Sequence, residues 1–194
     1  KKIAKEMIRN ENSIVLDISG NKIAQIGCGR KHTQIELSSM PDNLKNAYIS
    51  IEDERFYSHG GVDIKRTGGA IITYITHFGK SSFGGSTMTQ QLVKNLTGDT
   101  SDTAIRKVKE WCKAWQLESE LSKDEILEAY LNIIYVGPSM YGVETGSQYY
   151  FNKSCTELSL EECAFLAGIN NAPNTYNPFG EKDNTEKINK RTKT

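Results

Sequence analysis

The sequence predicts one mainly helical domain with a small β element near its start. Apolar residues recur at helical spacing through much of the chain that follows residue 40. Three Ser or Thr residues are each followed three positions later by Glu or Gln, which is the capping-box signature of a helix start. The strand-like pattern is confined to residues 13–27. A length of 194 residues is that of one domain with a real core.

The β element is predicted at residues 13–27, where two short strands surround a Ser-Gly-Asn turn. The first helix is expected to begin at Pro41, because proline is compatible with the first helical position. This helix brings Glu52 to its C-terminal end. Its apolar stripe consists of Leu44, Ala47, Tyr48 and Ile51.

Three later helices are predicted from the capping boxes Thr87/Gln90, Ser122/Glu125 and Ser159/Glu162. Between the first two boxes, helical spacing is shown by Ile105, Val108, Cys112 and Trp115. Of these, Cys112 is expected to be a buried free thiol. A core helix within residues 123–137 is predicted from Ile126, Leu127, Tyr130, Leu131 and Ile134. Cys155 and Cys163 could pair in an oxidising compartment.

Composition limits the classes of partner. Acidic and basic residues balance at 24 each, so no overall charge argues for nucleic acid or for an acidic partner. No run approaches the ~18 apolar residues that a membrane span needs. The apolar stretch 70–83 is interpreted first as a buried helix. The alternative is a surface that dips into a bilayer, since Phe78 and Phe83 lie around a Gly-Lys-Ser-Ser turn.

The first candidate site is the acidic run Glu52, Asp53 and Glu54, which Phe56, His59 and Gly60 follow. The plain interpretation is a solvated helix end and a turn. Ile51 and Phe56 bracket the acids, however, so at least one carboxylate should be partly buried. A partly buried carboxylate at the negative end of a helix, beside other acids, accepts a proton more readily and suits a general base.

The second candidate is the helix predicted just after Gly84 and Gly85. Its N-terminus presents unpaired N–H groups to an anion. An exposed helix face is the ordinary alternative, but such faces usually mix Glu and Lys. Neutral hydrogen-bonding groups with one Lys better fit sugars and phosphates. The order GxxxxGK[ST] of a nucleotide P-loop is missing, so ATP binding is not supported. The polar side chains are Thr87, Gln90, Gln91, Lys94 and Asn95.

The third candidate is the stretch RKVKE at residues 106–110. Arg106 and Glu110 are four positions apart, and an ordinary surface ion pair is the favoured interpretation when this stretch is taken alone. With Lys107 and Lys109, the same stretch could instead supply cations to a phosphate, and Glu110 would then be a second carboxylate of the site.

Together and in this order, these stretches resemble the family 51 peptidoglycan glycosyltransferases. These are the polymerising domains of class A penicillin-binding proteins and of monofunctional transglycosylases. The family's first motif, Glu-Asp-x-x-Phe-x-x-His-x-Gly, is matched by Glu52, Asp53, Phe56, His59 and Gly61. The second motif is matched by GGSTMTQQLVKN at 84–95, the third by Arg106, Lys107 and Glu110, and the fourth from Lys123 to Asn132. The resemblance spans nearly the whole chain.

The C-terminal motif departs from the family pattern. An Arg-Arg pair is usual there, but this chain has KRTKT, in which Arg191 matches the first Arg and Thr192 stands at the second position. The family's usual membrane-spanning helix before the domain is also missing from this sequence. We expect residues 1–194 to be a single glycosyltransferase domain excised from a longer, membrane-anchored chain.

The resemblance implies a mainly α, lysozyme-like (α+β) fold, with a helical lobe, a small β element and a membrane-proximal jaw that includes residues 70–83. It implies polymerisation of lipid II into β-1,4-linked glycan strands with inversion and release of undecaprenyl diphosphate. Glu52 would be the base that deprotonates the acceptor 4-hydroxyl. Glu110 would be the second catalytic group, either a proton donor to the phosphate or a group that orients the cations or a metal.

The resemblance also implies a set of binding residues and partners. A divalent cation, Mg or Mn, is the candidate cofactor with Glu110 as its candidate ligand, and no organic cofactor is expected. The implied partners are lipid II, the growing glycan chain, the bacterial membrane and other cell wall synthesis proteins, at the extracytoplasmic face of the cell membrane. The substrate-binding residues would be Asp53, Phe56, His59, Ser86, Thr87, Gln90, Gln91, Lys94, Asn95, Arg106, Lys107 and Arg191.

Two other functions are compatible with parts of this pattern. A lysozyme-like peptidoglycan hydrolase or lytic transglycosylase would need a catalytic Glu, but it would not need the polar, basic helix at 86–95. A non-catalytic glycan-binding module would need neither carboxylate to act in chemistry.

Overall fold

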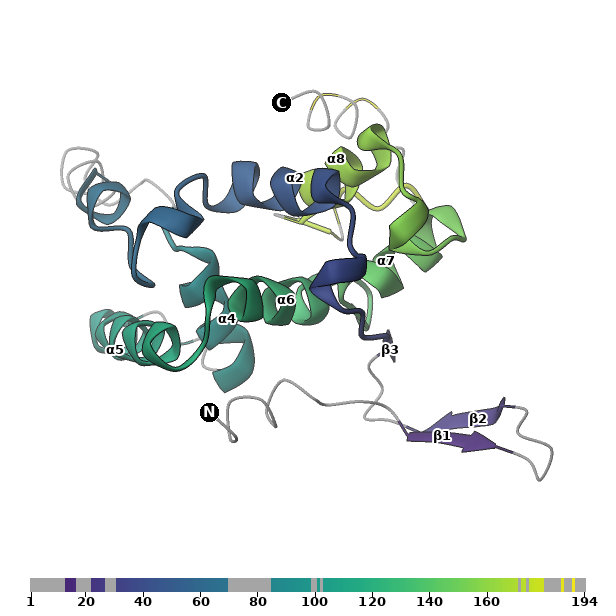
Figure 1. The fold of residues 1–194 in the computed structure, drawn as a ribbon, viewed down its shortest axis with the longest axis horizontal. Helices are drawn as coiled ribbons and strands as arrows, with labels where there is room; N and C mark the ends of the chain where they lie inside the picture. Colours follow the sequence, from purple (N-terminus) through teal and green to yellow (C-terminus); the bar gives the residue numbers. More distant parts are fainter. Residues whose placement is uncertain are drawn as a thin grey trace.

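The computed structural model describes residues 13–16, 22–26, 31–69, 85–98, 101, 103–170, 172–173, 175–179, 186 and 190. Within these ranges the chain is mainly helical, as predicted (Figure 1). The apolar stretch 70–83 and Arg191 lie outside the described residues. The α-helices are α2 (Asp42–Glu52), α4 (Met88–Thr97), α5 (Ala104–Glu120), α6 (Lys123–Ile133), α7 (Val143–Phe151) and α8 (Leu160–Ile169). The 3-10 helices are η1 (Leu37–Ser39), η2 (Phe56–Ser58) and η3 (Cys155–Glu157).

Among the described residues, the strands form two small sheets. The predicted hairpin is confirmed, with β1 (Ser13–Leu16) antiparallel to β2 (Lys22–Ile26). In the second sheet, β5 (Met140–Tyr141) pairs in parallel with β3 (Lys31–His32) and antiparallel with β4 (Tyr135–Gly137). This second sheet was not predicted, because strands of two or three residues are too short to show the alternation that identifies a strand.

The core lies between two groups of helices. Helix α2 packs against α8, and α4 packs against both α5 and α6 (Figure 1). Burying one large aliphatic or aromatic side chain contributes about 1.5–3 kcal/mol to stability, so the core residues between these helices hold the frame of the site. The predicted core positions of the 123–137 segment are all buried. The fully buried set includes Leu44, Tyr48, Phe56, Met88, Leu92, Ile126, Leu127, Tyr130, Leu131 and Leu166.

The helix starts agree closely with the sequence. All three capping boxes are present, with the side chain of Thr87, Ser122 or Ser159 accepting the backbone N–H three positions later. Helix α2 begins at Asp42, one residue after the prediction, because Pro41 occupies the N-cap position with extended backbone angles.

Helix α6 fixes the segment that leads into α2. The Asn132 side chain accepts the Ile35 N–H at 2.9 Å and donates to the Ile35 carbonyl at 2.8 Å. One turn earlier, the Glu128 carboxylate accepts the Leu37 N–H at 2.8 Å. Asn132 and Glu128, two polar residues of the fourth motif, therefore bind the backbone of Ile35 and Leu37. These contacts position the segment that leads into α2.

One prediction about α5 is wrong. Cys112 is exposed, and the helical stripe to which it belongs faces outward, with Ile105 70% and Trp115 49% exposed. The buried face of α5 instead contains Ala114 and Leu117. The loop that carries Gly61 packs on this face of α5, so closely that a side chain at position 61 would meet the Ala114 backbone. Cys155 and Cys163 are buried free thiols.

Two adjacent glycines test this close approach. Gly61 has φ +93°, and an added Cβ would lie 2.9 Å from the Ala114 carbonyl oxygen. We expect Gly61→Ala to lower the free energy of unfolding by about 1–3 kcal/mol, through strained backbone and the forced separation of the loop from α5. Thermal or urea unfolding measures the loss.

Gly60→Ala is the matched control, since an added Cβ there would meet nothing within 4 Å. That variant should stay within about 0.5 kcal/mol of the parent protein. Equal losses at both positions would contradict the close approach.

Candidate active site

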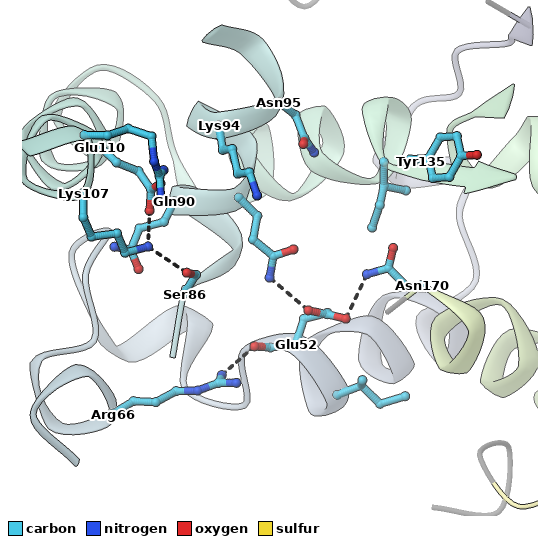
Figure 2. A pocket seen from close by; sticks show the side chains of 14 residues that line it. Glu52, Arg66, Ser86, Gln90, Lys94, Asn95, Lys107, Glu110, Tyr135 and Asn170 are labelled. Atoms are coloured by element: carbon cyan, nitrogen blue, oxygen red, sulfur yellow. Dashed lines mark hydrogen bonds and ion pairs between the residues drawn. The ribbon is translucent and has the colours of Figure 1, made fainter. Parts of the chain in front are cut away.

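A cavity of about 550 Å³ lies beside the C-terminal end of α2 (Figure 2). Helices α2, α4 and α5 contribute most of its walls, and the rest comes from β4, the end of α8 and the residues Arg66, Ser86 and Ile134. Most of the predicted site residues come together here. The lining residues are Ile51, Glu52, Arg66, Ser86, Gln90, Gln91, Lys94, Asn95, Arg106, Lys107, Glu110, Ile134, Tyr135 and Asn170.

Three oxygens of Glu52, two in the carboxylate and one in the backbone carbonyl, accept hydrogen bonds. One carboxylate oxygen accepts from Gln91 Nε2 at 2.9 Å, and the other accepts from Asn170 Nδ2 at 2.8 Å. The Glu52 carbonyl oxygen, at the negative end of α2, accepts from Arg66 Nη1 at 2.5 Å (Figure 2). A carboxylate at a helix C-terminus is unfavourable by itself. Here two amides and a guanidinium offset that cost. Glu54, by contrast, is exposed.

Asp53 is directed away from the cavity and is only 1% exposed. Its carboxylate accepts the Met88 N–H at 2.9 Å, in the first turn of α4, and contacts His59 Nε2 at 2.9 Å. His59 Nδ1 accepts the Gly61 N–H at 3.1 Å, so the proton of the neutral ring lies on Nε2 and is donated to Asp53. Asp53 therefore joins the end of α2 to the start of α4.

Phe56 and Thr87 also support the frame. Phe56 is fully buried, with Lys123 Nζ 4.5 Å from its ring centroid, and Lys123 in turn pairs with Glu118 at 2.7 Å. Thr87 is buried at the N-cap of α4 and donates its hydroxyl to the Gly61 carbonyl at 2.6 Å. We expected substrate contacts from Asp53, Phe56, His59 and Thr87. The structure places these residues outside the cavity lining, because their side chains are bonded or packed within the protein.

The opposite end of the cavity is cationic. Arg106 Nη1 lies 2.5 Å from one Glu110 oxygen, and Lys107 Nζ contacts the other oxygen and donates to Ser86 Oγ at 2.8 Å (Figure 2). Glu110 is only 4% exposed, so this cluster is not the ordinary surface pair that the spacing alone would favour. Lys94, on α4, adds a further ammonium group to the cavity wall.

Gln90 presents a buried donor to the cavity. Its Oε1 accepts the Thr87 N–H at 2.8 Å in the capping box, and only 1% of the residue is exposed. Its Nε2, within the part of the chain that the structure describes, has no hydrogen-bond partner. A buried donor without a partner costs roughly 1–3 kcal/mol, which a ligand oxygen would recover.

The residues around Glu110 do not fit a divalent cation. Both carboxylate oxygens are already engaged by positively charged groups, which would repel a metal ion. Across the described ranges, no three His, Cys, Asp or Glu side chains gather as a metal site. Nor does any helix there have the length and apolar character to cross a bilayer.

Arg66, Tyr135 and Asn170 line the cavity but were not predicted. Arg66 lies in the helical stretch at 64–69, and Tyr135 lies in a strand too short to recognise. Asn170 is the C-cap of α8, at the start of a loop rich in Asn and Pro. For Asn170, the composition of this loop was the available sequence signal. It indicates a turn, but it does not indicate which residues the turn contacts.

Comparison with known proteins gives a consistent result. The family described as "Transglycosylase" matches residues 19–194. Penicillin-binding protein 1A from Clostridium botulinum (strain Langeland) is 46% identical over 190 residues, which are 95% of this chain and 23% of that protein. Penicillin-binding protein 1F from Bacillus subtilis is 40% identical, over 92% of this chain and 25% of that protein. The chain thus spans about a quarter of the length of the curated relatives it matches.

One solved structure is a more distant likeness. The crystal structure of penicillin-binding protein 1A from Haemophilus influenzae has a TM-score of 0.46 and 22% sequence identity. That match covers 94% of this chain and 17% of that chain.

The junction at Asp53 can be tested by removing its carboxylate. We expect Asp53→Ala to lower the free energy of unfolding by about 1–3 kcal/mol, since it leaves the buried Met88 N–H and His59 without their acceptor. Chemical denaturation measures the change. Asp124→Ala removes an exposed carboxylate that accepts from exposed Tyr57 at 3.2 Å. Because Asp124 lies in the first turn of α6, its loss should cost up to about 1 kcal/mol. A similar loss in both variants would contradict a structural role specific to Asp53.

Proposed function

Because the chain belongs to the transglycosylase family, we propose that it is a peptidoglycan glycosyltransferase that polymerises lipid II. The product is a β-1,4-linked glycan strand, formed with inversion and with release of undecaprenyl diphosphate. One observation supports this assignment most directly. A single cavity contains a carboxylate held by neutral amides at one place and a cluster of Arg and Lys side chains at its opposite end.

An inverting transfer needs a base on one face of the sugar and stabilisation of the leaving group on the other. The acceptor 4-hydroxyl would lose its proton to Glu52 as its oxygen bonds to the donor's anomeric carbon. The bond from that carbon to the diphosphate oxygen breaks, and its electron pair leaves with the diphosphate. Lys94, Arg106, Lys107 and the unpartnered Gln90 Nε2 would stabilise the charge that develops there.

Glu110 is best suited to orient cations. Its two oxygens bind Arg106 and Lys107, which fixes both side chains at the cavity wall and neutralises part of their charge before substrate arrives. A proton donor to the phosphate would need a carboxyl oxygen free to face the substrate, whereas both Glu110 oxygens contact Arg106 or Lys107. Ser86 shares Lys107 with Glu110 and would be released to a phosphate oxygen when substrate binds.

The remaining site residues divide into two groups. Gln91 and Asn95 line the cavity beside Glu52 and Lys94, where amide groups can bind sugar hydroxyls or the diphosphate. Asp53 and His59 would act by holding α2 and α4 together. For Arg191, contact with substrate remains a prediction from the resemblance.

The proposal extends to the cellular setting. Lipid II carries its sugars on a lipid in the membrane, so the enzyme would work at the extracytoplasmic membrane surface, beside the growing glycan and other cell wall synthesis proteins. In this proposal residues 1–194 form one catalytic domain of a longer, anchored protein. The related penicillin-binding proteins, about four times longer than the chain's matched part, are compatible with that arrangement.

The main rival is a hydrolase or lytic transglycosylase that cleaves finished glycan. Such an enzyme has no diphosphate to stabilise, and the cluster of Arg106 and Lys107 around the buried Glu110 would then have no evident use. A non-catalytic glycan-binding module would not need Glu52 to be held at both oxygens. Purified protein in detergent should convert lipid II to polymer without clearing cell walls. Wall clearing without polymerisation would favour the hydrolase.

Replacing Glu52 tests the assignment of the base. We expect Glu52→Gln to reduce the rate of lipid II polymerisation by at least about 100-fold, because an amide cannot accept the acceptor's proton. The rate is measured by following glycan products on gels or by chromatography. Glu54→Gln, two residues away and exposed, should leave the rate within twofold of wild type. Full activity in Glu52→Gln would rule out this base.

A second substitution tests stabilisation of the leaving group. We expect Lys107→Met to lower kcat by roughly 10- to 1,000-fold, because one cation at the departing diphosphate is lost. Lys109→Met removes an exposed Lys of the same helix that does not line the main cavity, and it should change kcat less than twofold. Steady-state kinetics with lipid II measures kcat for both variants. Equal losses of kcat would show that only the overall charge of α5 matters.

A further inference from the structure

Glu52 belongs to a closed ring of hydrogen-bonded side chains. Gln91 and Asn170 each donate an amide N–H to one of its oxygens, at 2.9 and 2.8 Å. Tyr130 closes the ring behind them, since its hydroxyl donates to Gln91 Oε1 at 3.2 Å and accepts from Asn170 Nδ2 at 3.4 Å. Each of the four comes from a different part of the fold, namely α2, α4, α6 and the end of α8.

The direction of these hydrogen bonds gives Tyr130 a specific task. A Gln side chain can present either its oxygen or its NH2 group to a neighbour. Donation from the Tyr130 hydroxyl requires the oxygen of Gln91 to face Tyr130, so the NH2 group must face Glu52. The Tyr130 oxygen also accepts an N–H from Asn170. This contact favours the orientation in which the NH2 group of Asn170 faces both Tyr130 and Glu52.

We propose that Tyr130 and Asn170 are positioning residues, which orient the Glu52 carboxylate for proton transfer through this ring. The proposal rests on the proposed function, in which Glu52 is the base. Tyr130 does not line the cavity and acts only through Gln91 and Asn170. Asn170 lines the cavity and contacts Glu52 directly, so it fixes one oxygen while Gln91 fixes the other.

The surroundings of Tyr130 suit this task. The side chain is fully buried, and its ring packs edge-on against Tyr48 at a centroid distance of 6.5 Å, so the hydroxyl has little freedom to move. Burial raises the pKa of Tyr130 well above its ordinary value, and the negative charge of Glu52 raises it further. Tyr130 therefore stays protonated near neutral pH and remains a hydrogen-bond donor there.

The ring gives a physical reason for a tyrosine on a helix that otherwise reads as core. A phenylalanine would fill the same space beside Tyr48, but it would leave Gln91 Oε1 without its donor. The Gln91 amide could then rotate and present its oxygen to Glu52, where two acceptors would repel. Loss of orientation at the base lowers the rate of the chemical step more than the binding of substrate.

The experiment compares two hydroxyl deletions in buried tyrosines. Tyr130→Phe is expected to lower kcat for lipid II polymerisation roughly tenfold while KM changes less than twofold. Tyr48→Phe is the matched control, because Tyr48 is equally buried and packs on Tyr130, but its hydroxyl donates to the Leu166 carbonyl at 3.2 Å, outside the ring. Its kcat should stay within twofold of wild type. Thermal unfolding of both variants monitors the loss of stability.

Asn170→Ala provides a second test, from a half-buried position that does not depend on core packing. It should also lower kcat roughly tenfold, and the double variant Tyr130→Phe/Asn170→Ala should lose little more than either single variant, because both act through the same carboxylate. In a Glu52→Gln background, Tyr130→Phe should cause no further loss of residual rate.

The outcomes separate this inference from the function on which it rests. A kcat within twofold of wild type for both Tyr130→Phe and Asn170→Ala would overturn the positioning role of the ring, even if Glu52→Gln is inactive. Equal losses of kcat in Tyr130→Phe and Tyr48→Phe would overturn it as well. A rise in KM without a fall in kcat would also overturn it, because it would indicate substrate binding. Full activity of Glu52→Gln would overturn both the base and the ring.

Discussion

The carboxylate of Asp53 is the constraint on which the rest of the site depends. It follows the negative end of α2 directly, yet it accepts the Met88 N–H in the first turn of α4, where an acid is favourable. A residue that ends one helix unfavourably therefore begins another favourably. His59 fixes the same carboxylate and, through Gly61, the loop that packs on α5. This junction, together with the buried core between the helices, sets the relative positions of α2, α4 and α5.

Once these helices are fixed, the charges of the cavity are determined. Glu52 accepts hydrogen bonds from the neutral amides of Gln91 and Asn170, whereas both oxygens of Glu110 contact the cations Arg106 and Lys107. Two glutamates of one cavity thus differ in role because of their partners. The difference suits a transfer in which a proton is removed at one place and a diphosphate leaves at another.

The linear motifs contain residues that line the cavity and residues that support the fold behind it, side by side in the sequence. Glu52 and Asp53 are adjacent, but one lines the cavity and the other is buried behind it. In the fourth motif, Asn132 clamps the backbone that leads into α2, while the Tyr130 hydroxyl reaches Gln91 and Asn170. Neighbouring side chains of a helix point about 100° apart, so members of one motif can face different surroundings, and motif membership alone does not identify a substrate contact.

The sequence by itself determined the mainly helical class, the hairpin at its start, the capped helices and most of the cavity wall, including Glu52, Gln91, Lys94 and Glu110. Capping and periodicity suffice for the elements, because both are encoded within a few turns, whereas the cavity residues were identified from the order of motifs between residues 52 and 132. Only the tertiary structure decided that Cys112 faces outward, that Phe56 and His59 are internal, and that Asn170 reaches Glu52 across 118 positions of chain. Such pairings depend on which helix faces meet in three dimensions, and no local pattern contains that information.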